Sequence, residues 1–325
     1  MKFASLPNST RDGEVVFVSR DLKRAQKISS FSSSLIELIE KWNQVESELK
    51  IAYEKFNDDI SSGFDFDHAQ ALAPLPRCYQ FVDGSAFLNH GKIMKAAYKV
   101  ENEEPEGIPI LIQRQSDDFR PAYADYEFIK VEDQCDFEGE FAVVVSDTAM
   151  GSSKAEISQN IKLIMLMNDV SMRNLLKREI KMGFGFIQAK TATIFAPVAV
   201  TPDELGDAWQ DDKVHLDLNV YRNSELFGHP NGSEMNYSFS ELVEHLTYNR
   251  NIKAGTIIGS GTVSNELEKQ VGSACLAEGV AIEIFKHGSA KSNFIQPNEI
   301  VEMNVLDHMD NSVFGSIRTK FLNKN

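Results

Sequence analysis

The chain has 325 residues, of which 42% are hydrophobic and 25% are charged, a composition typical of a folded globular protein. Its 33 Lys and Arg against 48 Asp and Glu give a net charge of −15, which argues against nucleic acid and anionic membranes as partners. No apolar run approaches the roughly 20 residues of a membrane helix, and the first residues lack the apolar core of a signal peptide. The three cysteines lie far apart, which indicates a reducing cytoplasm and argues against a disulfide scaffold or a zinc–thiolate site.

The beginning of the chain predicts a hairpin followed by a helix. Asp12-Gly13 is a turn signal before the short apolar run 15–18, so residues 1–20 are predicted as a small hairpin. In residues 21–56 apolar side chains recur at spacings of three and four, with Lys and Glu between them. This stretch is therefore predicted to be mostly helical, with a packing role.

A domain boundary is predicted after this helix. Residues 57–76 are first polar and then contain prolines, which is typical of a linker. The prediction is a small N-terminal unit of residues 1–76 and a main domain of residues 77–325.

The main domain is predicted to be α+β and rich in strands. Short apolar runs separated by Gly, Asp, Asn and Pro predict strands at 143–145, 163–167, 198–200, 214–220, 256–258, 281–285 and 300–305. Helices are predicted to begin near Ser171 and Ser240. The strands and helices do not alternate as in a doubly wound fold. Neither a dinucleotide fingerprint nor a serine-hydrolase motif is present.

Three acids precede the predicted strand at 143–145. In an extended chain, residues two apart share a face, so Asp136, Glu138 and Glu140 point the same way as the apolar side chains that follow. Carboxylates that face an interior repel one another and lose hydration, and a hard divalent cation bound through oxygens would offset both costs. The alternative is an edge strand whose acids face water.

Two further residues are candidates for the same site. Asp169 ends an apolar strand, and Ser171 could cap the following helix; an Asp in this place also commonly serves only as a cap or turn. His90 lies seven residues after Asp83, although a lone His is more often a structural or surface residue than a catalyst.

Five motifs follow one another along the main domain. They are Asp83 with His90, Asp-Phe-Glu-Gly-Glu-Phe at 136–141, Asn-Asp-Val-Ser-Met-Arg at 168–173, Lys190 ahead of Ala196-Pro197, and the glycine-rich stretch 255–262. In content and order they resemble the motifs of the fumarylacetoacetate hydrolase family, with Thr256 in place of the family's Asp. The resemblance implies a catalytic domain of the fumarylacetoacetase type, a mixed β-sandwich or β-roll, behind a short N-terminal unit.

The resemblance also implies a metal site. The ligands of one Mg²⁺ or Ca²⁺ ion would be Asp83, Glu138, Glu140 and Asp169. All four are carboxylates, which suits a hard cation and not zinc. Arg173 and Lys190 would offset the remaining negative charge. Asp136 is left over, as an acid behind the ligands or facing solvent.

The activity implied by the resemblance is hydrolysis of a carbon–carbon bond in a 1,3-diketo acid. The ion would polarise the carbonyl oxygens, His90 would take a proton from water, and Glu278 would orient the imidazole and the water. Lys190 would stabilise the oxyanion. With fumarylacetoacetate, the products would be fumarate and acetoacetate, as in tyrosine and phenylalanine catabolism.

The substrate contacts depart from the family pattern. Ser85 and Ile112 stand where the animal enzymes have tyrosines, and Leu176 stands where the family has a glutamine. Among the residues expected to contact substrate, Arg173 and Thr262 match the family. The missing contacts could be replaced by Gln113, Arg114 or Gln188.

Sister activities on the same metal site therefore stay open: acylpyruvate hydrolysis, oxaloacetate decarboxylation or hydration of a 2-keto-enoate. A metal-binding protein without activity is the third alternative. The resemblance also implies a homodimer that takes a small diketo acid, whereas the cytoplasmic location is predicted from the cysteines.

Overall fold

The computed structural model describes residues 1–98 and 107–324. It confirms a mixed α+β fold, with 28% helix and 29% strand, so helices are more frequent than the sequence indicated. Among the described residues, no helix is long and apolar enough to cross a membrane.

Within the described residues, twelve strands form one large sheet. Along its main path the order is β4 (Phe64–Asp65), β3 (Arg24–Lys27), β2 (Glu14–Val18), β1 (Lys2–Leu6), β14 (Ala199–Val200), β11 (Ile161–Asn168), β10 (Gly139–Val145), β19 (Thr256–Gly259), β5 (Phe81–Gly84) and β6 (Leu111–Arg114). Off this path, β13 (Ile194–Phe195) pairs with β11, and β7 (Arg120–Pro121) pairs with β13.

The other described strands form one sheet of five and two small pairs. The five-stranded sheet runs β18 (Glu225–Gly228), β17 (Leu218–Arg222), β20 (Ile300–Val305), β21 (Ile317–Asn323) and β8 (Tyr126–Phe128). The pairs are β9 (Cys135–Asp136) with β12 (Ser171–Met172), and β15 (Trp209–Gln210) with β16 (Lys213–Val214).

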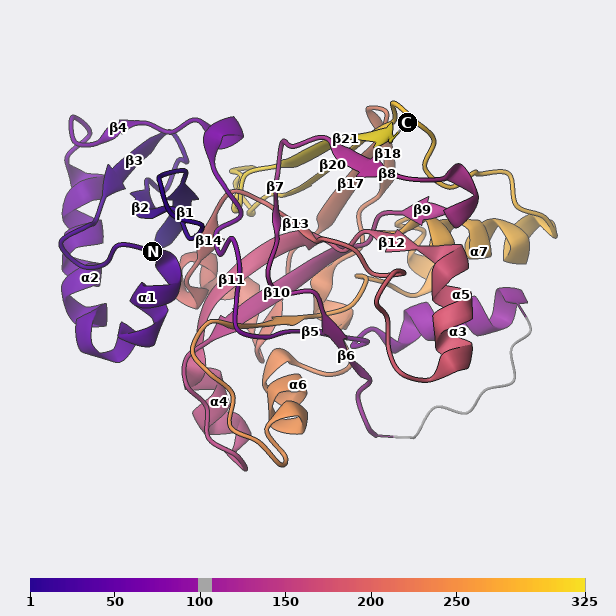
Figure 1. Cartoon of the computed structure of the whole chain (residues 1–325), viewed down its shortest axis with the longest axis horizontal. Helices are drawn as coiled ribbons and strands as arrows, with labels where there is room; N and C mark the ends of the chain where they lie inside the picture. Colours follow the sequence, from indigo (N-terminus) through magenta and orange to yellow (C-terminus); the bar gives the residue numbers. More distant parts are fainter. Residues whose placement is uncertain (99–106, 325) are drawn as a thin grey trace.

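Helices cover the edges and ends of these sheets (Figure 1). The α-helices are α1 (Leu35–Glu40), α2 (Trp42–Asp58), α3 (Leu88–Tyr98), α4 (Lys154–Asn160), α5 (Arg173–Met182), α6 (Phe239–Leu246) and α7 (Leu276–His287). Short 3₁₀ turns are η1 (His68–Gln70), η2 (Val131–Asp133), η3 (Pro202–Ala208), η4 (Gly232–Glu234) and η5 (Leu267–Lys269).

The N-terminal part contains the expected hairpin but less helix than expected. β1 and β2 pair antiparallel, and Gly13 before β2 has a φ of +67° that favours glycine. The prediction of helix from residue 21 is wrong up to α1, because β3 adds a third strand beside β2. Its four residues are too few to show a periodicity that would distinguish strand from helix.

The large sheet runs through both parts of the chain. β1 pairs with β14, with Phe3 opposite Ala199, so the N-terminal strands continue the sheet of the main domain. Figure 1 shows this arrangement, with α1 and α2 on the outer side of the N-terminal strands. The boundary at residue 76 stays a prediction.

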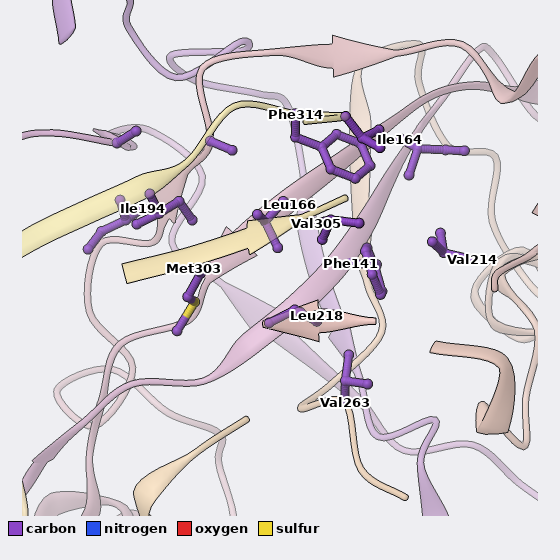
Figure 2. Close-up of a cluster of buried hydrophobic side chains, with 14 of the residues drawn as sticks. Phe141, Ile164, Leu166, Ile194, Val214, Leu218, Val263, Met303, Val305 and Phe314 are labelled. Carbon is purple, nitrogen blue, oxygen red and sulfur yellow. The ribbon is translucent and has the colours of Figure 1, made fainter. Parts of the chain in front are cut away.

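β10 contributes to two hydrophobic clusters, one on each of its faces. Phe141 packs between the large sheet and the five-stranded sheet, beside Leu218 and Val305 (Figure 2). Ala142 and Val144 face the opposite way, into the second cluster. Since Glu140 is two residues before Ala142, the strand alternation places its carboxylate at the end of that second interior, as the sequence predicted.

Five of the seven predicted strands are confirmed: 143–145, 163–167, 198–200, 256–258 and 300–305. Residues 214–220 divide between β16 and β17. The strand predicted at 281–285 is wrong, because these residues belong to α7.

Both predicted helices exist, α5 and α6, and each begins within two residues of the predicted start. Ser171, however, does not cap α5. The N-cap position is occupied by Met172, and the Ser171 hydroxyl instead donates to Glu138, 2.7 Å away.

Candidate active site

Three carboxylates meet at one side of the large sheet, near the start of β10 and near the ends of β5 and β11. Asp83 comes from β5, Glu140 from β10, and Asp169 directly follows β11. One oxygen of each lies within 4.8 Å of the other two, and all three residues are buried. The fold thus gathers acids that are far apart in the sequence.

Glu140 is the member of this cluster without a partner. Its side chain is completely buried, and neither carboxylate oxygen has a hydrogen-bond partner among the described residues. Burial, Asp83 and Glu138 raise the pKa of Glu140 well above its ordinary value. Burial also raises the pKa of Asp83, against the opposite effect of Lys190. A divalent cation would supply the missing partner, so these residues fit a metal ion bound through oxygens.

Asp169 is held by cationic and hydroxyl donors. Lys190 Nζ lies 2.7 Å from one carboxylate oxygen. Thr193 donates to the other oxygen at 3.1 Å, and the buried Arg114 guanidinium donates to the same atom. These contacts fix the orientation of the carboxylate and compensate part of the cluster's negative charge.

Glu138 lies beside the cluster in a different environment. Its Oε1 receives Lys190 Nζ at 2.8 Å and Ser171 Oγ at 2.7 Å, and its Oε2 receives Thr262 Oγ1 at 2.8 Å. Arg173 adds an ion pair at 2.9 Å. Burial opposes ionisation, but Arg173 and Lys190 outweigh it and lower the pKa of Glu138 well below its ordinary value. Its role as a metal ligand stays a prediction.

The predicted base and its orienting acid are in contact. His90 Nδ1 in α3 lies 2.7 Å from Glu278 Oε2 in α7, although 188 residues separate them. Glu278 is 1% exposed, whereas the His90 side chain is 21% exposed. When Nδ1 carries the proton that Glu278 accepts, Nε2 of His90 is the free acceptor, as a general base requires.

The four predicted substrate contacts are all engaged with protein groups. Arg173 and Thr262 bind Glu138, and Arg114 binds Asp169. Gln113, the neighbour of Arg114 in β6, accepts a hydrogen bond from Gln80 at 3.0 Å. Their roles towards substrate remain predictions.

A pocket of about 810 Å³ opens beside Lys190, and two of these residues, Gln113 and Arg114, line it. It is lined by residues of β6, including Ile112, Gln113 and Arg114, and by the loop after α5. In the sheet, Ile112 is the direct partner of Asp83, so the pocket adjoins the acid cluster.

Two further acids support the site, and the sequence anticipated one of them. Asp136 is fully buried, so the solvent-facing alternative is wrong, whereas the alternative of an acid behind the predicted ligands agrees with its contact: its carboxylate accepts Arg173 Nε at 2.7 Å. Glu179 in α5 was not recognised; it accepts the backbone N–H groups of residues 187, 188 and 189 at 3.1, 3.0 and 3.0 Å, immediately before Lys190. This role leaves no signal in the sequence, because the donors are backbone amides.

Family models match both parts of the chain. The model described as fumarylacetoacetate (FAA) hydrolase C-terminal matches residues 80–321, and the fumarylacetoacetase N-terminal domain 2 model matches residues 1–77. The chain belongs to the fumarylacetoacetate hydrolase family, as the sequence motifs predicted.

One curated relative is the oxaloacetate tautomerase YisK of Bacillus subtilis (strain 168). It is 30% identical over 135 residues, which are 42% of this chain and 43% of the relative. The chain thus aligns with less than half the length of that protein.

Two solved structures align over 100% of both chains. Maleylpyruvate hydrolase from Sphingobium sp. SYK-6, in complex with manganese (II) ion and pyruvate, has a TM-score of 0.66 and 13% identity. Fumarylacetoacetate hydrolase (EaFAH) from psychrophilic Exiguobacterium antarcticum has a TM-score of 0.63 and 16% identity. At these identities the similarity shows the fold.

Proposed function

We propose that this chain is a metal-dependent hydrolase that cleaves a carbon–carbon bond in a 1,3-diketo acid. The observation that carries the proposal is the contact of His90 Nδ1 with Glu278 Oε2 at 2.7 Å. An acid cluster alone would suit several reactions of keto acids. Hydrolysis additionally needs a base that activates water, and the contact of His90 with an acid supports this role for the pair.

The proposed metal ligands are Asp83, Glu140 and Asp169, with Glu138 as the fourth. The unpaired oxygens of the buried Glu140 support this choice. Mg²⁺ or Ca²⁺ is the proposed ion, since both prefer carboxylate oxygens, and Mn²⁺ also suits such ligands. When bound, the ion would supply Lewis-acid polarisation of the substrate's carbonyl oxygens.

His90 would remove a proton from the attacking water through Nε2. The Glu278 carboxylate holds Nδ1–H and would stabilise the positive charge that develops on the imidazole. The protonated imidazole can later return this proton to the leaving enolate. Lys190 Nζ lies between Glu138 and Asp169, and we propose that this ammonium group stabilises the oxyanion.

Fumarylacetoacetate is the substrate that we propose to test first, with fumarate and acetoacetate as products. This choice follows the motif resemblance and would give the protein a role in tyrosine and phenylalanine catabolism. We also propose a homodimer, from the same resemblance, and a cytoplasmic location, from the cysteine content. We propose residues 77–325 as the catalytic domain, since all site residues lie there, and residues 1–76 as a small N-terminal unit that shares its sheet.

A second candidate is a sister reaction of a 2-keto acid at the same metal site. Ile112 is the sheet partner of Asp83 and stands where a polar substrate contact was expected. The identity of the substrate's acyl group therefore stays open. Acylpyruvate hydrolysis, oxaloacetate decarboxylation and 2-keto-enoate hydration belong in the same assay panel, and the relative named oxaloacetate tautomerase adds oxaloacetate tautomerisation.

The decisive experiment follows the diketone absorbance of fumarylacetoacetate with Mg²⁺ and with EDTA, for the wild type and His90→Ala. We expect turnover only with metal, and a loss of about 10²- to 10⁴-fold in His90→Ala. The thermal shift caused by Mg²⁺ should survive in this variant. Undiminished turnover by His90→Ala would show that His90 is not the base.

A further inference from the structure

We propose that Asp136 is a positioning residue that fixes the position of the His90–Glu278 pair relative to the acid cluster. The inference rests on the proposed hydrolase function, because it assigns these two groups to one reaction. Asp136 itself has no part in the predicted metal site or in the proton transfer.

On one side, Asp136 binds the start of α7. Its Oδ1 accepts the N–H of Leu276 at 2.7 Å, and its Oδ2 accepts the N–H of Ala277 at 2.9 Å. These are the first two residues of the helix, and the third is Glu278, whose N–H donates to Cys275 Sγ at 3.4 Å. The first N–H groups of a helix have no partner inside the helix, so Asp136 fixes where α7 begins and thereby where Glu278 stands.

On the other side, the same carboxylate binds Arg173, which forms an ion pair with Glu138 beside the acid cluster. Asp136 Oδ2 accepts Arg173 Nε at 2.7 Å, and the other end of this guanidinium lies 2.9 Å from Glu138 Oε1. The Asp136 side chain therefore joins an arginine at the acid cluster to the helix that carries Glu278.

The charge and burial of Asp136 exceed what a helix cap requires. Its side chain is completely buried, and burying a carboxylate costs free energy unless it is well paired. A neutral Ser or Asn caps a helix about as well, and here the N-cap position itself is held by Cys275. What a neutral cap would not provide is the ion pair with Arg173, so the charge serves the connection between the two groups.

The test compares Asp136→Asn with a matched control on the same helix. Glu283 in α7 also accepts two backbone N–H groups, from Lys291 and Ser292, but does not contact the acid cluster in any described interaction. With saturating Mg²⁺, we expect Asp136→Asn to lower kcat about 10- to 100-fold with KM within about threefold, because a displacement of about 1 Å near the reacting atoms has effects of this size. Glu283→Gln should stay within about twofold of the wild type.

A double-mutant cycle with Glu278→Gln separates positioning from general destabilisation. If Asp136 acts through Glu278, Asp136→Asn/Glu278→Gln should be no slower than Glu278→Gln alone. Losses that multiply in the double variant would overturn the proposal. So would a kcat of Asp136→Asn that matches the Glu283→Gln control.

A readout without substrate or metal keeps the inference separate from the proposed function. In the metal-free protein, the ¹⁵N and ¹H signals of His90 Nδ1–H report its bond to Glu278. They should shift or broaden in Asp136→Asn and stay unchanged in Glu283→Gln; unchanged signals in both variants would overturn the inference. A wild type that is inactive on diketo acids would instead overturn the proposed function. If Asp136→Asn does not fold, Asp136→Ser retains one acceptor for α7 without the ion pair and is measured in its place.

Discussion

The backbone of Gly259 lies directly against the carboxylate of Asp83. A Cβ atom built on Gly259 would be 2.4 Å from Asp83 Oδ1 and 2.6 Å from Met167 Cε, closer than non-bonded atoms approach. The last residue of β19 is therefore a glycine because the Asp83 carboxylate occupies the space of a side chain.

Gly259→Ala should consequently displace the Asp83 carboxylate. We expect Mg²⁺ affinity to fall by about tenfold or more, as outer positions that orient ligands typically show. Isothermal titration of the metal-free variant measures this directly. A variant with wild-type metal affinity would show that Asp83 is not a ligand or that the strand relaxes without cost.

Glu140→Gln should have opposite effects on the metal-free and the metal-loaded protein. Because the pKa of Glu140 is raised well above its ordinary value, ionising this buried carboxyl at higher pH costs stability that a Gln does not cost, so there the metal-free variant should unfold at a higher temperature than the metal-free wild type. The rise in melting temperature on adding Mg²⁺ should disappear. Thermal unfolding in EDTA and in Mg²⁺ tests both parts, and a variant that keeps the full Mg²⁺ shift would contradict the ligand role.

The pH dependence of stability should differ with and without metal. Asp83 and Glu140 have raised pKa values in the folded, metal-free protein. Groups of this kind contribute stability that is fully present below their unfolded pKa, roughly 4, and is lost as pH rises through the folded pKa. Their part of the metal-free stability should thus decline above about pH 4, and the Mg²⁺ shift should grow in the same direction as protons cease to compete.

Melting curves at several pH values, with EDTA and with Mg²⁺, provide the measurement. Glu140→Gln serves as the control, since its metal-free stability should depend less steeply on pH. A Mg²⁺ shift that grows as pH falls would contradict the assignment.

Glu179→Ala should loosen the segment that carries Lys190. Three backbone N–H groups before Lys190 lose their common acceptor. Residues 187 and 188 are exposed and their N–H groups can bind water, but Ala189 is buried and its N–H would be left without an acceptor. We therefore expect a loss of about 1–3 kcal/mol of stability, the cost of one unsatisfied buried group, and a fall in kcat of about 10-fold from misplacement of Lys190. Limited proteolysis and kinetics test this. Glu283→Ala is the control, because Glu283 likewise accepts backbone N–H groups of the loop after α7.

The acid cluster of the candidate site could be predicted largely from the residues themselves. Glu138 and Glu140 share a strand face by simple alternation, and Asp169 ends a recognisable apolar strand. What alternation could not show is that the two glutamates differ: Glu138 is surrounded by donors, and Glu140 has none among the described residues.

The His90–Glu278 pair depends on a tertiary contact that the spacing of residues in the sequence does not show. His90 and Glu278 are 188 residues apart, and their pairing followed only from the family resemblance. The wrong prediction of a strand at 281–285, which belongs to α7, has a related cause. Ala281-Ile282-Glu283-Ile284-Phe285 has the β-branched and aromatic composition of a strand, whereas the bonds of Asp136 to the first amides of the helix lie far away in sequence.

The pairing of β1 with β14 has a consequence for how the chain can be divided. A protein that starts at residue 77 would leave the backbone edge of β14 without its neighbour, together with the apolar side chains that Phe3 and Trp42 now cover. Unpaired strand edges of this kind recruit strands from other molecules. The N-terminal unit therefore covers the edge of β14, and its removal would expose a strand at which two copies of the chain could pair.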